Sequence, residues 1–171
     1  MELPLFFLGL AALLIVVLAL FALGWRGRRS RQQGMPRPVP VPEDLTEPDF
    51  QAVGQYVATT TAGDWLDRVA LYGLGVKSNA TAAVFPSGLF LARSGAPDLW
   101  IPREDLRDVR LERGMAGKFV EKEGLVIVTW LLGGKRLDTG FRTRTAADKT
   151  PLLNAITDLL PASDTPSEEQ L

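Results

Sequence analysis

Three acidic side chains, Asp105, Asp108 and Glu112, are the best candidates in this sequence for metal ligands or paired catalytic acids. Closely spaced carboxylates serve both purposes in proteins. In this stretch they alternate with arginines, which are Arg103, Arg107, Arg110 and Arg113. Opposite charges that alternate along an exposed segment neutralise one another and form a solvated face. The pattern therefore favours a self-compensating charged surface, and we expect no bound metal ion.

A short glycine-rich loop is better suited to contact a ligand or a partner. Gly114, Gly117 and Lys118 lie within five residues of one another, and Arg113 precedes them. Glycine lets backbone amides point outward, and the two cations add positive charge, which suits an anion or a partner's carboxylate. A plain hairpin connection explains the same residues and is the more common use of such a loop. Arg113, Gly114, Gly117 and Lys118 are therefore the candidate contact residues.

The residue inventory excludes many kinds of enzyme. The chain contains no cysteine and no histidine, so it lacks thiolate nucleophiles, imidazole bases and the usual zinc ligands. Gly73 and Gly75 begin like a dinucleotide-binding fingerprint, but Ser78 occupies the third glycine position and no helical pattern follows. That arrangement favours a turn. We expect a protein that is not an enzyme and that has no cofactor.

The segment 50–160 is expected to form one domain of short strands followed by a helix. Glycine and proline divide it into apolar and β-branched runs. The predicted strands are 53–60, 68–75, 80–85, 88–92, 98–101, 108–113, 124–132 and 136–141. The nearly continuous apolar run 125–132 indicates a strand that is covered on both faces, whereas 136–142 alternates. The pattern predicts an all-β domain, a small antiparallel barrel or sandwich, with a C-terminal α-helix.

Two starting points are possible for this final helix. Leu152, Ile156 and Leu159 share one face at helical spacing. Thr150 as N-cap, with Pro151 in the first helical position, fits a start at residue 151. If the helix instead begins at Thr145, Pro151 lies inside it and should kink it.

The N-terminal segment 1–26 is expected to be a transmembrane anchor. It carries one charged side chain before Arg26, that of Glu2, and the run 5–25 would form a helix of roughly 32 Å, which matches a bilayer core. A cleaved signal peptide is the alternative, but there the basic residues precede the apolar run. In this chain they follow it.

The residues after the apolar run predict its orientation. Trp25 lies where an aromatic side chain would meet the headgroups, and Arg26, Arg28, Arg29 and Arg31 come next. Positive charges stay on the cytoplasmic side, so we expect an outside N-terminus and a cytoplasmic domain. The same arginines would contact acidic headgroups at about 1 kcal/mol each.

The remaining segments are predicted from proline and charge. Residues 27–49 form a basic, then proline-rich linker, with prolines at 36, 38, 40 and 42 that favour an extended spacer. Residues 161–171 are polar and acidic and should be disordered. From residue 38 onward the chain has 14 basic and 19 acidic residues, which disfavours nucleic acid as a partner.

Several stretches of the domain resemble one known family. They read GDWLDRVALYGLGVKSNATAAVFPSGLFLAR, LWIPREDLRDVRL and GMAGKFVEKEGLVIVTWLLGGKRLDTGFR. Together they are similar to actinobacterial membrane-anchored proteins with a bacterial PH-like domain. The matching positions are Trp100, Ile101, Pro102, Asp105, Leu106 and Val109 for one signature, Gly117 and Lys118 for the loop, and 137–142 for a strand. The resemblance implies a PH-like antiparallel barrel behind one transmembrane helix, in the bacterial cell membrane.

These observations lead to one expected function and two alternatives. We expect a membrane-tethered, non-enzymatic interaction or scaffolding module with a cytoplasmic PH-like domain and an unknown protein partner. The first alternative is a binder of an anionic ligand or a lipid headgroup. The second is an accessory subunit of a membrane transport or biosynthetic complex.

Overall fold

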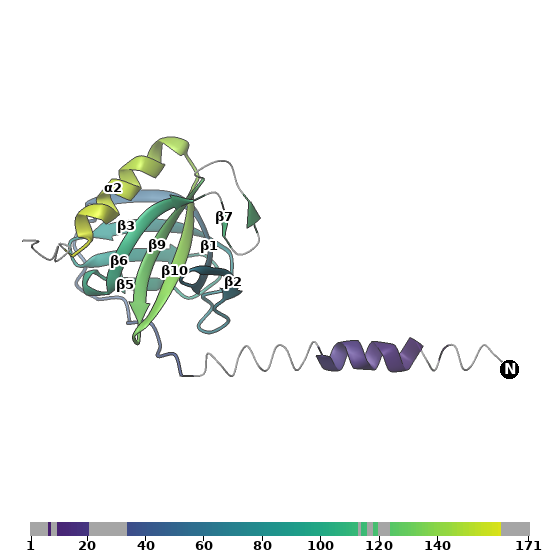
Figure 1. Cartoon of the computed structure of the whole chain (residues 1–171). Coiled ribbons are helices and arrows are strands. Elements are labelled where there is room, and N and C mark those ends of the chain that lie inside the picture. Colours follow the sequence, from purple (N-terminus) through teal and green to yellow (C-terminus); the bar gives the residue numbers. More distant parts are fainter. Residues whose placement is uncertain are drawn as a thin grey trace, which may run out of the picture. The chain divides into compact units, whose positions relative to one another are not determined.

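The computed structural model (Figure 1) describes residues 7, 10–20, 34–112, 114–115, 118–119 and 124–161. The chain divides into two compact units, Met1–Gly34 and Met35–Leu171. In the first unit, residues 10–20 are helical and their apolar side chains are exposed. Within the described parts of the chain, no helix is both long and apolar enough to cross a membrane. Trp25, Arg26, Arg28, Arg29 and Arg31 lie outside the described residues, as does much of the expected anchor.

Within its described residues, the second unit is a barrel of antiparallel strands with one α-helix. Its strands are β1 (Phe50–Thr61), β2 (Asp64–Arg68), β3 (Ser78–Phe85), β4 (Gly88–Arg93), β5 (Leu99–Pro102), β6 (Leu106–Glu112), β7 (Gly114–Met115), β8 (Lys118–Phe119), β9 (Leu125–Leu132) and β10 (Lys135–Thr143). The order in the main sheet is β5-β4-β3-β1-β10-β9-β6, with β2 paired to β1. The predicted all-β domain with a C-terminal helix is therefore confirmed.

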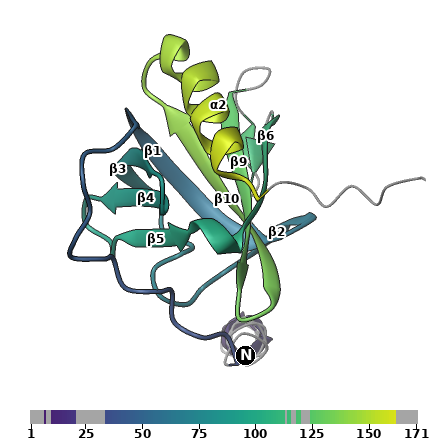
Figure 2. The ribbon, with the colours of Figure 1, turned by 90° about the vertical axis from the view of Figure 1, so that its left-hand side faces the viewer.

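Helix α2 (Lys149–Leu159) closes one end of this barrel (Figure 2). It packs against β6, β1 and β3. Its buried face consists of Leu152, Ile156 and Leu159, the three residues that the sequence placed together. Because this face covers the space that the curved sheet leaves open, the helix completes the apolar core.

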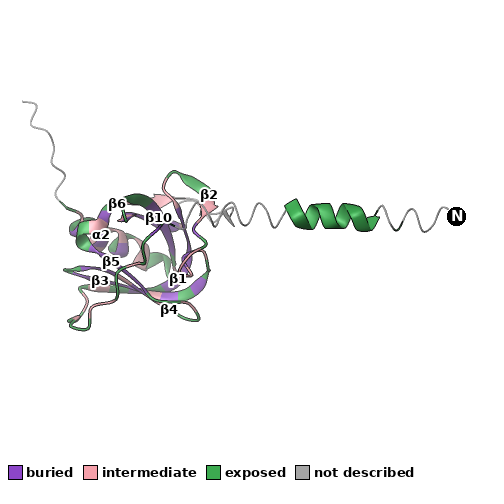
Figure 3. Cartoon of the chain, turned by 90° about the horizontal axis from the view of Figure 1, so that it is seen from below, coloured by how far each residue is buried: buried purple, intermediate pink, exposed green. Residues whose placement is uncertain are grey.

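The sequence pattern of β9 and β10 explains how the sheet is buried (Figure 3). In β9, residues 125–130 are buried on both faces, as the continuous apolar run predicted. In β10, Leu137, Thr139 and Phe141 face the core, and Arg142 is exposed. Asp138 departs from the expected alternation because it is buried. Where β1 pairs with β10, a Cβ on Gly54 would lie 2.2 Å from the Arg142 carbonyl oxygen, so only glycine fits there.

One predicted strand, 68–75, is wrong. The chain leaves the sheet after Arg68, and residues 69–76 form a loop. Tyr72 (φ 55°) and Gly73 (φ 70°) both adopt left-handed backbone conformations, which a strand does not allow. Val69 and Leu74 are buried in the core, so their apolar character reflects packing over the barrel rather than sheet pairing.

The helix begins between the two expected starts. A 3₁₀ turn at Ala146–Asp148 precedes it, and α2 starts at Lys149. Pro151 is thus in the first turn, where its missing N–H needs no partner and causes no kink. No side-chain hydrogen bond caps the helix, so Thr150 does not have the expected capping role.

The proline-rich segment 35–49 is part of the domain, which corrects the expected spacer and the expected domain start at residue 50. Met35 is only 4% exposed and belongs to the main core. Further along, Val41 and Leu45 pack on an outer apolar cluster formed by Ala83, Phe85 and Trp100. Residues 35–42 form neither helix nor strand, and Met35, Val41 and Leu45 are used for packing. Of the expected disordered tail, residues 162–171 lie outside the described residues.

Candidate functional site

The glycine loop that the sequence singled out connects two short strands. β7 and β8 pair antiparallel, with Gly114 opposite Phe119 and Met115 opposite Lys118. This confirms the hairpin connection. Arg113 and Gly117 lie outside the described residues, so the role of this loop in binding stays a prediction.

The acidic and basic residues of β6 compensate one another, as expected. Arg110 forms ion pairs with Glu112 at 2.6 Å, Asp138 at 2.9 Å and Asp108 at 3.4 Å. Its hydrogen bonds to Asp138 and Glu112 outweigh the effect of partial burial, which alone would lower the pKa of Arg110, and that pKa is raised. No cluster of three potential metal ligands occurs within the described ranges. The arrangement is that of a structural charge network.

Asp105 is not part of this network. Burial, and to a smaller extent the neighbouring Glu104, raise the pKa of the Asp105 carboxyl. Asp105 ends the short 3₁₀ turn Arg103–Asp105, whereas Asp108 and Glu112 lie on β6. The three acids singled out in the sequence therefore do not form one site.

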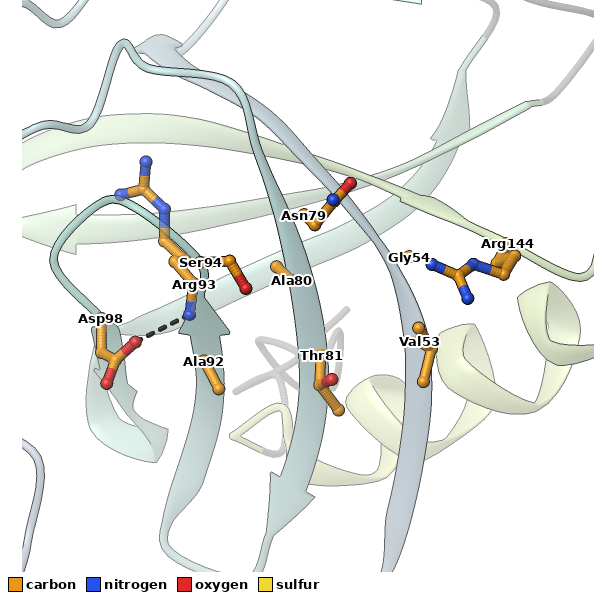
Figure 4. A pocket seen from close by; sticks show the side chains of 10 residues that line it. All are labelled: Val53, Gly54, Asn79, Ala80, Thr81, Ala92, Arg93, Ser94, Asp98 and Arg144. Atoms are coloured by element: carbon orange, nitrogen blue, oxygen red, sulfur yellow. Dashed lines mark hydrogen bonds between the residues drawn. The ribbon is translucent and has the colours of Figure 1, made fainter.

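A pocket of about 440 Å³ lies on the outer face of β1, β3 and β4 (Figure 4). Its lining residues are Val53, Gly54, Asn79, Ala80, Thr81, Ala92, Arg93, Ser94, Asp98 and Arg144. The strand register aligns Val53, Thr81 and Ala92 in one row across the three strands. In Figure 4 these three side chains lie next to one another and point the same way. Their small size leaves the sheet face hollow.

Strand alternation explains why this row faces outward. Ala52, Ala82 and Leu91 are buried on the opposite face, in the core. Val53 is 47% exposed although it is apolar. The pocket therefore offers a strip of small side chains, apolar at Val53 and Ala92 with Thr81 between them, on a sheet face that this domain does not cover with its own helix.

Charged and polar groups surround this strip. Arg144 is exposed just after β10, and its backbone N–H donates to the Val53 carbonyl at 2.8 Å. On another side, Asp98 accepts a hydrogen bond from the Arg93 backbone N–H at 2.7 Å. Asn79 and Ser94 add hydrogen-bonding groups to the lining. Such a surface suits binding of a peptide segment with an apolar side chain and an acidic group.

Arg93 contributes its backbone to the pocket, but its side chain points away from those of Val53, Thr81 and Ala92 (Figure 4). The side chain is 6% exposed. Its guanidinium donates to the carbonyls of Val76 at 2.7 Å, Gly73 at 2.9 Å and Pro97 at 3.2 Å, and Nε donates to the Ser78 hydroxyl. Burial lowers the pKa of Arg93. The cation fastens the loop 73–76 to β4 and is not available to a ligand.

Tyr56 lies beneath this cation in a buried polar chain. Its hydroxyl donates to the Leu74 carbonyl at 2.7 Å and is 2.6 Å from the Thr59 hydroxyl. The chain continues to Thr139 and the Trp130 indole N–H. Burial raises the pKa of Tyr56 to about 12, although Thr59 and Arg93 oppose this. The phenol therefore stays protonated at neutral pH and has a structural role.

The comparison with protein families assigns the fold. Residues 35–157 match the family described as bacterial PH domain-like. The chain belongs to this family. The match begins at Met35, the residue at which the second structural unit begins. The comparison with curated proteins found no match. A bacterial PH-like domain indicates a non-catalytic interaction module.

Sequence reasoning missed both the pocket of this PH-like domain and the buried Arg93. The alternation of buried and exposed residues along β1 and β3 is a signal for an outer face, since Val53 and Thr81 follow it. That signal does not reveal that the face is hollow, because the strand register brings the small residues together. Arg93 ends a strand, and sequence reasoning expects an arginine at such a position to be exposed. Only the fold shows the backbone carbonyls that surround its side chain.

Proposed function

We propose that this protein is a membrane-tethered, non-enzymatic interaction module of the bacterial cell membrane. Its N-terminal segment 1–26 spans the membrane, and its PH-like domain is cytoplasmic and recruits a protein partner. The observation that carries the proposal is the open pocket on β1, β3 and β4, whose strip of small side chains has exposed Arg144 beside it.

The sequence supports the tether. The run 5–25 has no charged residue, and arginines follow it directly. The helical residues 10–20 expose their apolar side chains, which suits a lipid environment. A tethered domain meets membrane-bound partners at high local concentration, so modest affinity is sufficient.

The pocket chemistry supports a peptide segment as the partner. Val53 and Ala92 provide an apolar contact, and Arg144 provides a cation for an acidic side chain. The lining does not contain the excess of cations that nucleic acid requires. We infer that the partner places an apolar side chain against the strip and a carboxylate near Arg144.

Photocrosslinking in cells tests this function. A photoreactive amino acid replaces Thr81 in the full chain, and a matched chain carries the same group at Asn154, exposed on α2. We expect a discrete protein adduct from position 81 that is lost when Arg144→Glu is added. Equal adducts from both positions, or no adduct from position 81, would contradict the proposal.

The same cells test the two alternatives. If the protein instead binds an anionic ligand or a lipid headgroup through the loop 113–118, crosslinking should give adducts with lipid. Lys118→Gln combined with Arg113→Gln should remove these lipid adducts, and Arg144→Glu should leave them unchanged. If the protein is an accessory subunit of a transport or biosynthetic complex, the adduct from position 81 should co-purify with that complex at fixed stoichiometry.

A further inference from the structure

The end of the barrel away from α2 is formed by four segments that contact one another. They are the start of the domain at 35–37, the β1–β2 turn with β2 at 62–68, the loop 71–77 and the β9–β10 turn at 133–136, and we call them the proximal rim. Figure 2 shows the β9–β10 turn at this end and α2 at the other. The chain from the N-terminal unit joins the domain here, at Met35.

Contacts between neighbouring segments close the rim into a ring. The Tyr72 hydroxyl donates to the Met35 carbonyl at 2.8 Å, and the Arg37 guanidinium lies 6.0 Å from the centre of the Tyr72 ring. The Pro36 ring packs against Gly133 in the β9–β10 turn. The Ala62 N–H then donates to the Arg136 carbonyl at 3.0 Å. These contacts fix the rim segments relative to one another.

A further contact connects β2 with the loop 71–77. Arg68 Nη1 donates to the Gly75 carbonyl at 3.2 Å. This bond joins β2 to the loop 71–77. Leu66 lies on β2 and Val76 lies on this loop, so both belong to the connected segments of the rim.

The proximal rim carries exposed apolar side chains. Among the described residues of the domain, the large apolar side chains that are exposed are Val39, Val53, Trp65, Leu66 and Val76. The last three, exposed by 46%, 61% and 52%, all lie on the rim. Single exposed apolar residues are common, but three on one rim, one of them tryptophan, are typical of a surface that enters a membrane interface.

The charges on the rim favour an anionic surface. Its exposed cations are Arg37, Lys77, Lys135 and Arg136. The acids of the rim are Asp64 and Asp67, and both are engaged locally. Asp64 accepts from the backbone N–H groups of Leu66 and Asp67, and Asp67 accepts from the Thr61 hydroxyl. The four exposed cations thus outnumber the two acids on this side of a domain that is acidic elsewhere.

We propose that the proximal rim docks onto the anionic membrane surface, with Trp65, Leu66 and Val76 at the headgroup level. This inference rests on the proposed tether. Since a residue extends by at most about 3.6 Å, the chain between residues 25 and 35 spans no more than about 36 Å. Rim docking gives the domain one orientation, with α2 directed away from the bilayer. It is a second contact surface, separate from the pocket.

Fluorescent labelling of the full chain tests rim docking, because the natural chain contains no cysteine. Leu66→Cys carries an environment-sensitive nitrobenzoxadiazole dye, and Asn154→Cys on α2 is the matched control. Each chain is reconstituted in vesicles of phosphatidylglycerol and phosphatidylcholine. We expect a blue shift and strong quenching by spin-labelled lipid at position 66, with a water-like spectrum at position 154.

Two further measurements separate the docking from the tether. Flotation of the vesicles in alkaline carbonate reports the tether alone. A chain that floats while its label at position 66 remains water-like overturns rim docking and leaves the tether intact, and a chain that does not float overturns both. Lys77→Glu combined with Arg136→Glu should reduce the blue shift at position 66 and leave flotation unchanged. An unchanged blue shift in this double variant would show that the anionic surface is not what the rim binds.

Discussion

The guanidinium carbon of Arg93 lies 3.8 Å from the centre of the Tyr56 ring. A cation at this distance from an aromatic face is stabilised by the ring, the more so when both groups are withdrawn from water. The two residues join β4 to β1, and their polar ends hold the carbonyls of the loop 71–76. This pair therefore connects the sheet that forms the pocket with the proximal rim.

Arg93→Lys should destabilise the domain by about 2 kcal/mol. Lysine cannot reproduce the planar fork that donates to Gly73, Val76 and Pro97, so these partly buried carbonyls lose their donors. Arg142→Lys, an exposed substitution on β10, is the control and should change stability by no more than about 0.5 kcal/mol. Urea unfolding in mild detergent, followed by circular dichroism, measures both. Equal stability of the two variants would contradict the role assigned to Arg93.

Tyr56→Phe should remove the part of the loss of folding stability at alkaline pH that comes from ionisation of the Tyr56 phenol. The pKa of Tyr56 is raised from 10.0 to about 12 in the folded chain, so its contribution is fully present below pH 10 and is lost as the pH rises from 10 to 12. The natural chain should lose about 2 to 3 kcal/mol over this window. The phenylalanine variant should be less stable at pH 8 by about 1 kcal/mol, because Leu74 loses its donor. Its stability should fall less from pH 10 to 12, and an equal fall in both chains would contradict the assignment.

Met35→Ala should cost about 2 to 4 kcal/mol, because a buried side chain leaves a cavity in the core. Val39→Ala, at a site that is 46% exposed in the same segment, is the control. Thermal unfolding distinguishes the two variants. If the segment 35–49 were a free spacer, the two substitutions would have the same small effect.

Asp138→Asn should be far more damaging than Asp108→Asn. Asp138 is 6% exposed and accepts hydrogen bonds from Arg110 and Thr129, and loss of one partner of a buried ion pair costs about 3 kcal/mol. Asp108 has an exposed carboxylate 3.4 Å from Arg110, and its loss should cost less than about 0.5 kcal/mol. Urea unfolding compares them, and a larger effect at Asp108 would refute this reading of the network.

The elements that the sequence predicted well are those whose apolar residues are apolar because they are buried within a regular strand or helix. In β9 both faces are buried, and in α2 one stripe is, so the pattern 125–132 and the spacing of Leu152, Ile156 and Leu159 lead directly to the fold. The predicted strand 68–75 was wrong because Val69 and Leu74 are apolar for a different reason. They cover the barrel end from a loop, and composition does not distinguish the two uses.

The proline-rich segment shows a second limit of sequence reasoning. Alternating prolines indicate that the segment is not helical, but they do not reveal whether it is free or packed. Met35 and Val41 have partners from β-strands far along the chain, which no local pattern indicates. The pocket was missed for the same reason, since Val53, Thr81 and Ala92 become one surface only through strand register.

Cysteine accessibility in intact cells tests the central claim, a PH-like domain tethered at the inner face of the membrane, most directly. Single cysteines replace Glu2 or Asn154 in the otherwise cysteine-free chain, and a membrane-impermeant maleimide is added before or after permeabilisation. We predict that position 2 is labelled in intact cells and that position 154 is labelled only after permeabilisation. Labelling of position 154 in intact cells would contradict this account. So would isolation from the cells of a mature chain that lacks the first 26 residues.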